Sequence, residues 1–398
     1  MQSIDFDMIG EKIMDKAVVV GGSNGIGLAL ANNLLSKGYF VYIVDRVQPN
    51  AELLTKGDYR YVESNLMEFD ENIFSTLAMD SGIRCLMLTA GLGRVADFEY
   101  LHIAEIEKLM RVNAISAIKI IRLFYERIKN ESPFYCGVMG SIAGLISSPM
   151  FSVYAASKAA ICRFIESVNV ELEAANTQNR ILNVSPGSLK GTKFNGGEND
   201  LSQLVDVAST IVDKMFARET LFIPQYEETY ANVLARYQQN AAEFGQSSYQ
   251  YKKQSGRVMN EKKVIIGYLS GTFDLFHIGH LNLLRKAKAE CDYLIVGVHK
   301  DGSWKGKETY IPFNERVEIL KACKYVDKVV QSFPEDSDAY DAYKINKLFV
   351  GSDYKGTERF NRYEEYFKDK NVQIVYFPYT QGTSSTQLRE KLSSNKNS

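Results

Sequence analysis

At 398 residues, the chain is longer than one hydrophobic core usually serves, which favours two domains of unequal size. A net charge of -1 provides no general field for nucleic acid or an anionic membrane, so any phosphate binding must be local. Five cysteines without paired spacing predict free thiols in a reducing cytoplasm. The polar, acidic N-terminal stretch leads us to expect no signal peptide, no membrane insertion and a cytoplasmic protein.

An apolar run at residues 16–20 ends in the glycine-rich segment GGSNGIG, and residues 28–35 follow with helical spacing. A strand, tight turn and helix in this order let the backbone approach a pyrophosphate, and the free N–H groups of the helix start favour the anion. A second predicted strand, residues 39–44, ends in Asp45, about 20 residues beyond the glycines, where a carboxylate can bind ribose hydroxyls. Asp45 favours NAD, whereas Arg46 could neutralise the extra phosphate of NADP.

Tyr154 and Lys158 lie four residues apart, and therefore on one face of a predicted helix. A phenol with a pKa near ~10 is a poor acid or base at neutral pH unless a nearby cation favours the phenolate. Ser141 lies thirteen residues upstream. We interpret the three residues as a proton-transfer site, against the alternative of a helix-face tyrosine and a solvated lysine.

Across residues 15–225 the chain resembles the short-chain dehydrogenase/reductase family. The matching positions are Gly21, Gly25, Gly27, Thr89-Ala90-Gly91, Asn113, Ser141, Tyr154, Lys158 and Pro186-Gly187. The resemblance implies that Tyr154 is the general acid for carbonyl reduction and that Ser141 polarises the carbonyl. It implies that Lys158 holds the ribose and lowers the pKa of the tyrosine, and that Asn113 places a water. The implied NAD or NADP site consists of Gly21, Ser23, Asn24, Gly25, Ile26, Gly27, Asp45, Arg46, Ala90, Gly91, Pro186 and Gly187.

The chain departs from this family at two positions that brace the turn or adjoin the cofactor. Val20 stands where the family often has Thr, and Thr89 replaces the usual Asn. A polar, glycine-rich segment follows Pro186-Gly187, and in this family the matching loop closes over the substrate. Candidates for binding a phosphate on the substrate, with solvated side chains as the alternative, are Lys190, Lys193 and Arg94.

Residues 226–261 separate the two motif-bearing regions. Tyr230, Val233, Leu234 and Tyr237 have helical spacing, which predicts a helix followed by a polar linker ending near Asn260. Such an aromatic stripe is typical of a packing surface, either between domains or between subunits.

The segment GTFDLFHIGH follows a predicted strand at residues 263–270 and opens a predicted helix at 277–289. His277 and His280 stand at the start of that helix, three residues apart. A histidine pair at this spacing could ligate a metal, but no third ligand is evident nearby in the sequence.

Over residues 262–392 the chain resembles the nucleotidylyltransferases with a His-x-Gly-His signature, and most closely their glycerol-3-phosphate cytidylyltransferase-like branch. The resemblance implies in-line attack by a substrate phosphate on the α-phosphorus of CTP, accompanied by Mg²⁺, with release of pyrophosphate. The implied catalytic residues are His277, His280, Lys305 and Lys307. The implied nucleotide site adds Gly271, Thr272, Phe273, Arg316, Asp353, Thr380, Gly382, Ser384, Ser385 and Thr386. Tyr379 occupies a position where this branch usually has Arg, so ATP stays open as an alternative to CTP.

These observations predict an α/β protein with two Rossmann-like, doubly wound parallel-sheet domains in tandem, at residues 1–225 and 262–398, joined by a helix and linker at 226–261. The two resemblances together imply reduction of a phosphorylated sugar to a polyol phosphate, followed by formation of a CDP-polyol. Two active domains with unrelated substrates, or a transferase regulated by a dinucleotide-binding sensor, are the alternatives. The families also imply a homodimer or homotetramer.

Overall fold

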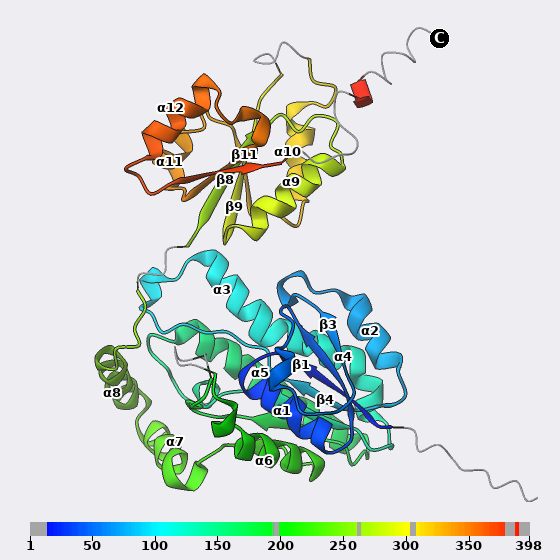
Figure 1. Ribbon diagram of the computed structural model, residues 1–398. Coiled ribbons are helices and arrows are strands. Elements are labelled where there is room, and N and C mark those ends of the chain that lie inside the picture. Colours follow the sequence, from blue (N-terminus) through cyan, green and yellow to red (C-terminus); the bar gives the residue numbers. More distant parts are fainter. Residues whose placement is uncertain are drawn as a thin grey trace, which may run out of the picture. The chain divides into compact units, whose positions relative to one another are not determined.

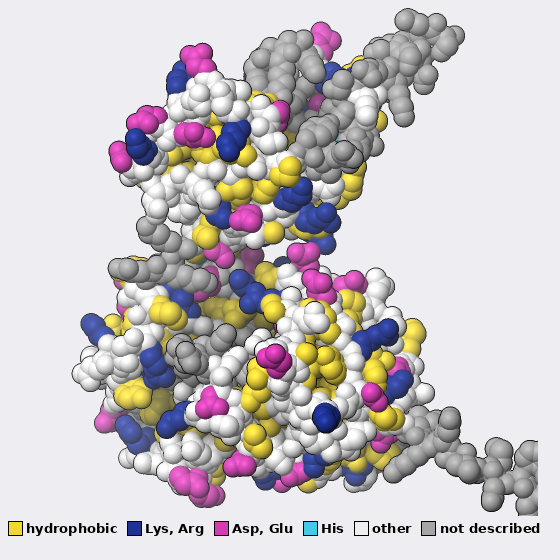
Figure 2. All heavy atoms as spheres, viewed as in Figure 1, with side chains coloured by type: hydrophobic (Ala, Val, Ile, Leu, Met, Phe, Trp, Pro, Cys, Tyr) yellow, Lys and Arg dark blue, Asp and Glu magenta, His cyan; other side chains and the backbone are white. Residues whose placement is uncertain are grey.

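The computed structural model describes residues 14–192, 194, 199–260, 264–302, 308–378 and 387–389. The chain divides into two compact units, residues 1–261 and residues 262–398. On the visible face of each unit, basic and acidic side chains are intermixed (Figure 2), in keeping with the net charge of -1. No helix in the described ranges is long and apolar enough to cross a membrane.

The first unit is built on a seven-stranded parallel sheet with the order β3-β2-β1-β4-β5-β6-β7 (Figure 1). Its strands are β1 Lys16–Val20, β2 Phe40–Asp45, β3 Tyr59–Glu63, β4 Ile83–Leu88, β5 Tyr135–Met139, β6 Ile181–Val184 and β7 Leu221–Phe222. Because β1 pairs with both β2 and β4, the strand order reverses there, and the carboxyl ends of β1 and β4 open a crevice typical of ligand sites in such sheets.

Helices cover both faces of this sheet. They are α1 Gly25–Ser36, α2 Glu71–Met79, α3 Ile103–Met110, α4 Ser116–Lys129, α5 Ser152–Ala174 and α6 Val205–Phe216. Strand β1 is buried from Ala17 to Val20 and alternates between two cores: Val18 packs with residues of α2, α4 and α5, while Val19 packs with residues of α1 and α6. This two-sided burial is the reason that β1 is a continuous apolar run without polar alternation.

Two further helices, α7 Ala231–Gln239 and α8 Ala241–Gln254, follow β7 and belong to the first unit. Asn240 caps α8 by accepting a hydrogen bond from the backbone N–H of Glu243 at 3.1 Å. The hydroxyl of Tyr230 lies so close to Gly187 that a Cβ at residue 187 would overlap it. The segment that the sequence predicts as a helix and linker is therefore part of the first unit and packs on it.

The second unit contains a five-stranded parallel sheet with the order β10-β9-β8-β11-β12. Its strands are β8 Ile266–Gly271, β9 Tyr293–Val298, β10 Lys328–Gln331, β11 Lys347–Gly351 and β12 Gln373–Phe377, and its helices are α9 Ile278–Ala289, α10 Phe313–Lys321, α11 Asp338–Tyr343 and α12 Glu358–Phe367. One core contains Leu284 of α9 and Leu320 of α10, and the other contains Ala339 of α11 and Phe360 of α12. Helices thus cover both faces here too, and the predicted pair of doubly wound α/β domains is confirmed.

Candidate functional sites

The first site is a cavity of about 570 Å³ above the carboxyl ends of β1 and β4. Gly21 has a φ of +83°, which a side chain would strain, and a Cβ at Gly27 would lie 2.0 Å from the carbonyl oxygen of Gly21. Only glycine allows this close approach of helix α1 to the turn. The exposed backbone, the helix start and the cavity size fit a dinucleotide cofactor.

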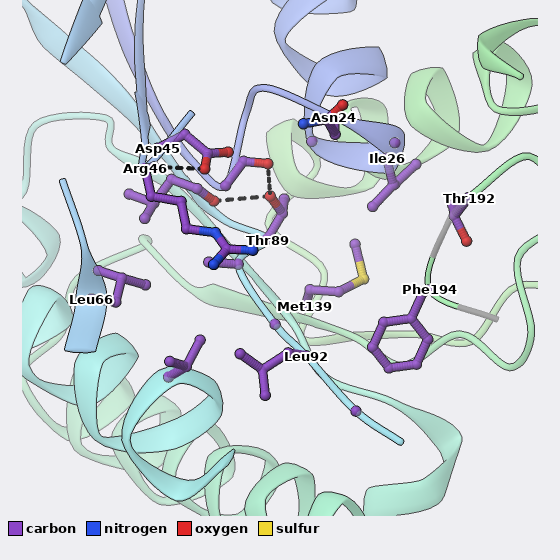
Figure 3. Close-up of a pocket in the computed structure, with 18 of the residues that line it drawn as sticks. Asn24, Ile26, Asp45, Arg46, Leu66, Thr89, Leu92, Met139, Thr192 and Phe194 are labelled. Atoms are coloured by element: carbon purple, nitrogen blue, oxygen red, sulfur yellow. Dashed lines mark hydrogen bonds between the residues drawn. The ribbon is translucent and has the colours of Figure 1, made fainter. Parts of the chain in front are cut away.

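Most of the predicted cofactor residues line this cavity. They are Gly21, Asn24, Gly25, Ile26, Gly27, Asp45, Arg46, Ala90, Gly91, Pro186 and Gly187. Ser23 does not line the cavity: its side chain is buried, and its backbone N–H donates to Oδ2 of Asp45 at 3.1 Å. The aspartate therefore ties β2 to the glycine turn, and the side chain of Arg46 reaches into the cavity beside it (Figure 3).

The predicted proton-transfer residues meet at the inner end of the same cavity, which Ser141, Tyr154 and Lys158 all line. Helix α5 carries Tyr154 and Lys158 on one face, and the loop after β5 carries Ser141. The ammonium of Lys158 donates to the carbonyl oxygen of Met139 at 2.7 Å. This bond ties Lys158 of α5 to the end of strand β5.

The acid–base state of this cluster differs from the sequence expectation. Burial raises the pKa of Tyr154 to about 12, although a hydrogen bond with Ser141 acts in the opposite direction. Burial also lowers the pKa of Lys158 to about 8. We expected Lys158 to lower the pKa of the tyrosine. In the structure removal from water outweighs any such effect, and the lysine is directed toward Met139.

Asn113, expected to place a water, is buried and does not line the cavity. It lies in a π-helical turn, Arg111–Ile115, between α3 and α4. Its side-chain oxygen accepts from the N–H of Leu92 at 2.9 Å, and its Nδ2 donates to the carbonyl oxygen of Leu92 at 2.8 Å and to the hydroxyl of Ser157 at 3.0 Å. Asn113 thus joins the loop after Gly91 to helix α5.

Thr89, one of the two positions at which the chain departs from the family pattern, contacts the glycine turn. Its hydroxyl lies 2.8 Å from the carbonyl oxygen of Val20 and 3.0 Å from that of Gly21, at the root of the glycine turn (Figure 3). Thr89, the residue directly after β4, therefore braces the turn through its hydroxyl. The signal was available in the paired departure of Val20 and Thr89 from the family pattern.

Aromatic rings form the wall beside the catalytic tyrosine. Phe151 stacks on Tyr154 with ring centroids 4.0 Å apart, and Phe194 lies 5.3 Å from the same ring. Figure 3 shows Phe194 turned toward the cavity, next to Met139. No sequence pattern singles out these two phenylalanines, because isolated aromatic residues are common in cores.

Of the three cations predicted to bind a substrate phosphate, the two that the structure describes, Arg94 and Lys190, do not line the cavity. Arg94 is buried, with a bidentate ion pair to Glu105 at 2.7 and 2.9 Å and hydrogen bonds to the carbonyl oxygens of Tyr100 and Met259. Its guanidinium is therefore committed to holding the chain together. Lys190 is exposed and does not line the cavity, and Lys193 lies outside the described residues.

The second site lies at the carboxyl end of β8, where Gly271 and Thr272 lead into the helix that carries both histidines. His277 caps α9: its Nδ1 accepts from the N–H of Gly279 at 3.0 Å, so a neutral ring carries its proton on Nε2. The ring of His280 stacks on it with centroids 4.1 Å apart. Burial, with the neighbouring His277 adding to it, lowers the pKa of His280 to about 4, and burial lowers the pKa of His277.

Phe273 and Arg316, both predicted to touch the nucleotide, have buried side chains. The ring of Phe273 packs in the core beneath His280. The guanidinium of Arg316 donates to four backbone carbonyl oxygens, those of Ile311, Thr272, His299 and Lys300, at 2.5 to 2.9 Å. These contacts make Arg316 a positioning residue for the loops around the site, in place of a direct nucleotide ligand.

Asp353 lies exposed in a short turn, Ser352–Tyr354, at the carboxyl end of β11. The remaining predicted residues of this site lie outside the described residues: Lys305, Lys307, Tyr379, Thr380, Gly382, Ser384, Ser385 and Thr386. Among the residues that the structure describes, no group of three or more His, Cys, Asp or Glu side chains could hold a metal ion.

Comparison with known proteins assigns each unit. The family of short chain dehydrogenases matches residues 15–202, and the cytidylyltransferase-like family matches residues 268–394. The glycerol-3-phosphate cytidylyltransferase of Staphylococcus aureus is 31% identical over 134 residues, which cover 33% of this chain and 95% of that protein. The enzyme of the same name from Bacillus subtilis is 34% identical, over 33% of this chain and 97% of that protein.

For the first unit, a Helicobacter pylori protein named "Probable short-chain type dehydrogenase/reductase VdlC" is 30% identical over 179 residues, 44% of this chain and 65% of that protein. Among solved structures, a short-chain dehydrogenase from Sphingobium yanoikuyae in complex with NADPH is 19% identical, with a TM-score of 0.48 over 57% of this chain and 94% of that chain. The chain thus belongs to the cytidylyltransferases through its second unit and matches the short chain dehydrogenases through its first, and it is a bifunctional NAD(P)-dependent oxidoreductase and nucleotidyltransferase.

Proposed function

We propose that the chain makes a CDP-polyol in two consecutive reactions. The first unit reduces the carbonyl of a phosphorylated ketose or aldose, and the second transfers a cytidylyl group from CTP to the resulting polyol phosphate. The observation that carries the proposal is the convergence of Ser141, Tyr154 and Lys158 in a cavity of dinucleotide size, in the same chain as a cytidylyltransferase unit. A pure sensor has no need of this proton chemistry.

In the first reaction, NAD(P)H would be held by the glycine turn and Asp45, and it supplies the hydride when bound. Tyr154, whose high pKa keeps the phenol protonated, donates its proton to the carbonyl oxygen. Ser141 shares a hydrogen bond with that phenol and is placed to polarise the same oxygen. The product gains hydrogen on both carbon and oxygen and becomes an alcohol.

In the second reaction, a phosphate oxygen of the polyol phosphate bonds to the α-phosphorus of CTP. The bond from that phosphorus to its β-bridging oxygen breaks, and pyrophosphate leaves. We assign His277, which stands at the start of α9, to contact with a phosphate oxygen of the nucleotide. We assign Lys305, Lys307 and residues 380–386 to phosphate binding, with Mg²⁺ accompanying the triphosphate.

The candidate substrates are ribulose 5-phosphate, fructose 6-phosphate and dihydroxyacetone phosphate, whose reduced forms are all polyol phosphates. CDP-polyols are activated units for surface polymers, which by analogy gives the chain a place in their synthesis. Tyr379, in place of the usual Arg, keeps ATP in the test as an alternative donor.

The proposal is tested with purified full-length chain. Each of CTP, ATP, UTP and GTP is combined with Mg²⁺ and a panel of polyol phosphates, and pyrophosphate release is measured. The carbonyl precursor of the accepted polyol phosphate is then tested with NADH and NADPH. We expect turnover with CTP and one polyol phosphate, and oxidation of NAD(P)H by its precursor. Turnover of unrelated substrates by the two units would overturn the consecutive pathway.

A further inference from the structure

Lys252 of α8 is a half-buried cation that the two reactions do not use. Its ammonium donates to the hydroxyl of Ser148 at 2.5 Å and to the carbonyl oxygen of Pro149 at 2.9 Å. An ammonium has three N–H donors, so one remains. No carboxylate in the described part of the chain forms an ion pair with it, and burial lowers its pKa to about 8. A partly buried charge without a counter-ion destabilises the fold. A bound anion would supply the missing counter-charge.

A second cation makes the site more positive. After burial, the positive charge of Arg257 is the second cause that lowers the pKa of Lys252. Its guanidinium lies over the ring of Tyr251 and its Nε is 3.4 Å from the hydroxyl of Ser255, and within the described ranges it too has no ion pair with a carboxylate. The two positive charges repel one another because no carboxylate of the described residues lies between them. An anion bound between them would be attracted to both, and this attraction would offset the repulsion.

The pair is connected to the reductase site through the loop 147–151. The ammonium of Lys252 lies 5.9 Å from the ring centroid of Phe151, and that ring stacks on the catalytic Tyr154 at 4.0 Å. The cation is thus one aromatic ring away from the proton donor. The hydroxyl of Ser147, in the same loop, is buried and has no hydrogen-bond partner among the described residues.

We propose that Lys252 and Arg257 bind the phosphate group of the carbonyl substrate. The ligand class is a phosphate monoester dianion on a short sugar chain, with its carbonyl at Tyr154 and its phosphate beyond Phe151. Lys252 supplies its remaining N–H, Arg257 a forked pair of donors, and Ser147 a hydroxyl. The proposal rests on the proposed function, and it assigns substrate specificity to the segment after β7 in place of Arg94 and Lys190.

The first test compares variants of the full chain. K252Q and R257Q should each raise the KM for the phosphorylated carbonyl substrate about 10- to 100-fold and change kcat less than about threefold. The reason is that each variant loses a charge-assisted hydrogen bond that the substrate and the transition state make equally. Reduction of the corresponding sugar without phosphate should be unaffected. The matched control is K253Q, which removes the exposed neighbouring lysine and should leave KM unchanged. An unchanged KM in K252Q, while the wild type reduces the phosphorylated substrate, would overturn the site and leave the proposed function standing.

The second test needs neither catalysis nor a variant. Wild-type chain is labelled briefly with acetic anhydride, with and without inorganic phosphate at millimolar concentration, and the modification of Lys252 and Lys253 is measured by peptide mass spectrometry. We expect phosphate to protect Lys252 at least fivefold and Lys253 not at all. If the wild type reduces no phosphorylated carbonyl, the proposed function fails. The labelling of Lys252 still shows in that case whether an anion binds there. Equal labelling of Lys252 in both conditions overturns it.

Discussion

The ammonium of Lys158 donates a hydrogen bond to the carbonyl oxygen of Met139, the last residue of β5, at 2.7 Å. This contact holds the lysine in a buried site, where its charged form is disfavoured and its pKa falls to about 8. The lysine is therefore a cation below about pH 8 and neutral above it, while Tyr154 keeps its proton until about pH 12.

The first prediction concerns the pH dependence of carbonyl reduction. If the cation of Lys158 assists the reaction, log kcat/KM stays level up to about pH 8 and falls above it by up to one decade per pH unit, because the free enzyme loses that charge. A Lys158→Arg variant keeps its positive charge above about pH 8. Its reaction should be slower, but its log kcat/KM should not decrease above about pH 8. A profile of the wild type that stays flat to pH 10 would remove Lys158 from the proton chemistry.

The second prediction concerns the proton donor. Tyr154→Phe removes the acidic hydroxyl and keeps the ring that stacks on Phe151, so reduction should slow by about 10² to 10⁴. Binding of NAD(P)H, followed by its fluorescence, should change less than threefold. Tyr226→Phe, at an exposed position of the same unit, serves as the control. Retention of a tenth or more of the activity by Tyr154→Phe would assign the proton donor elsewhere.

The third prediction concerns the brace of the glycine turn. Thr89→Val preserves shape and removes the hydroxyl that lies against the carbonyl oxygens of Val20 and Gly21. A lost hydrogen bond of about 1 kcal/mol should weaken NAD(P)H binding roughly fivefold to tenfold. Thr89→Ser retains the hydroxyl and should bind as the wild type does. Equal dissociation constants for the Val and Ser variants would show that the hydroxyl is dispensable.

The fourth prediction concerns the stability of the second unit. Arg316→Met leaves four backbone carbonyl oxygens without their buried donor, which should cost about 3–5 kcal/mol of unfolding free energy. Transferase activity should then be lost at a lower temperature, while reductase activity survives heating as before. Arg362→Met, at an exposed position of α12, is the matched control. Equal heat resistance of the two variants would contradict the role given to Arg316.

The fifth prediction concerns acid. The pKa of His280 is lowered to about 4 in the folded unit, from an ordinary value of 6.5. Between these values the unfolded chain binds a proton that the folded unit does not, so stability is lost as the pH falls from 6.5 toward 4. Urea unfolding of the second unit at several pH values should show this slope, and His280→Asn should reduce it. An identical slope in the variant would place the acid sensitivity elsewhere.

The sequence predicts those residues whose positions are fixed by backbone geometry. The glycine turn, Asp45 and Ala90-Gly91 lie at the carboxyl ends of the adjacent parallel strands β1, β2 and β4. Such ends meet at one edge of a sheet, so the convergence of these residues follows from the strand pattern. The four-residue spacing of Tyr154 and Lys158 likewise fixes a common helix face.

The partners of long cations cannot be predicted in this way. Arg94 and Arg316 have flexible side chains whose contacts depend on which chain segments pack nearby, and both are engaged with the protein itself. The approach of α8 to the loop 147–151 is a tertiary contact between residues about a hundred positions apart, with no local pattern to announce it. The pKa of Tyr154 depends on burial, which a motif does not reveal.

The tie between Arg94 and Met259 has a mechanical consequence. Near residue 260 the chain is also fastened by the N–H of Met259 to the carbonyl oxygen of Val95 and by Asn260 to Asp97 through two hydrogen bonds of 3.0 Å. Tension applied through residue 261 would be shared among these parallel attachments before it reached Gly93 at the cavity. The first unit is therefore anchored where the chain leaves it, by four hydrogen bonds that tie Met259 and Asn260 to residues 94–97.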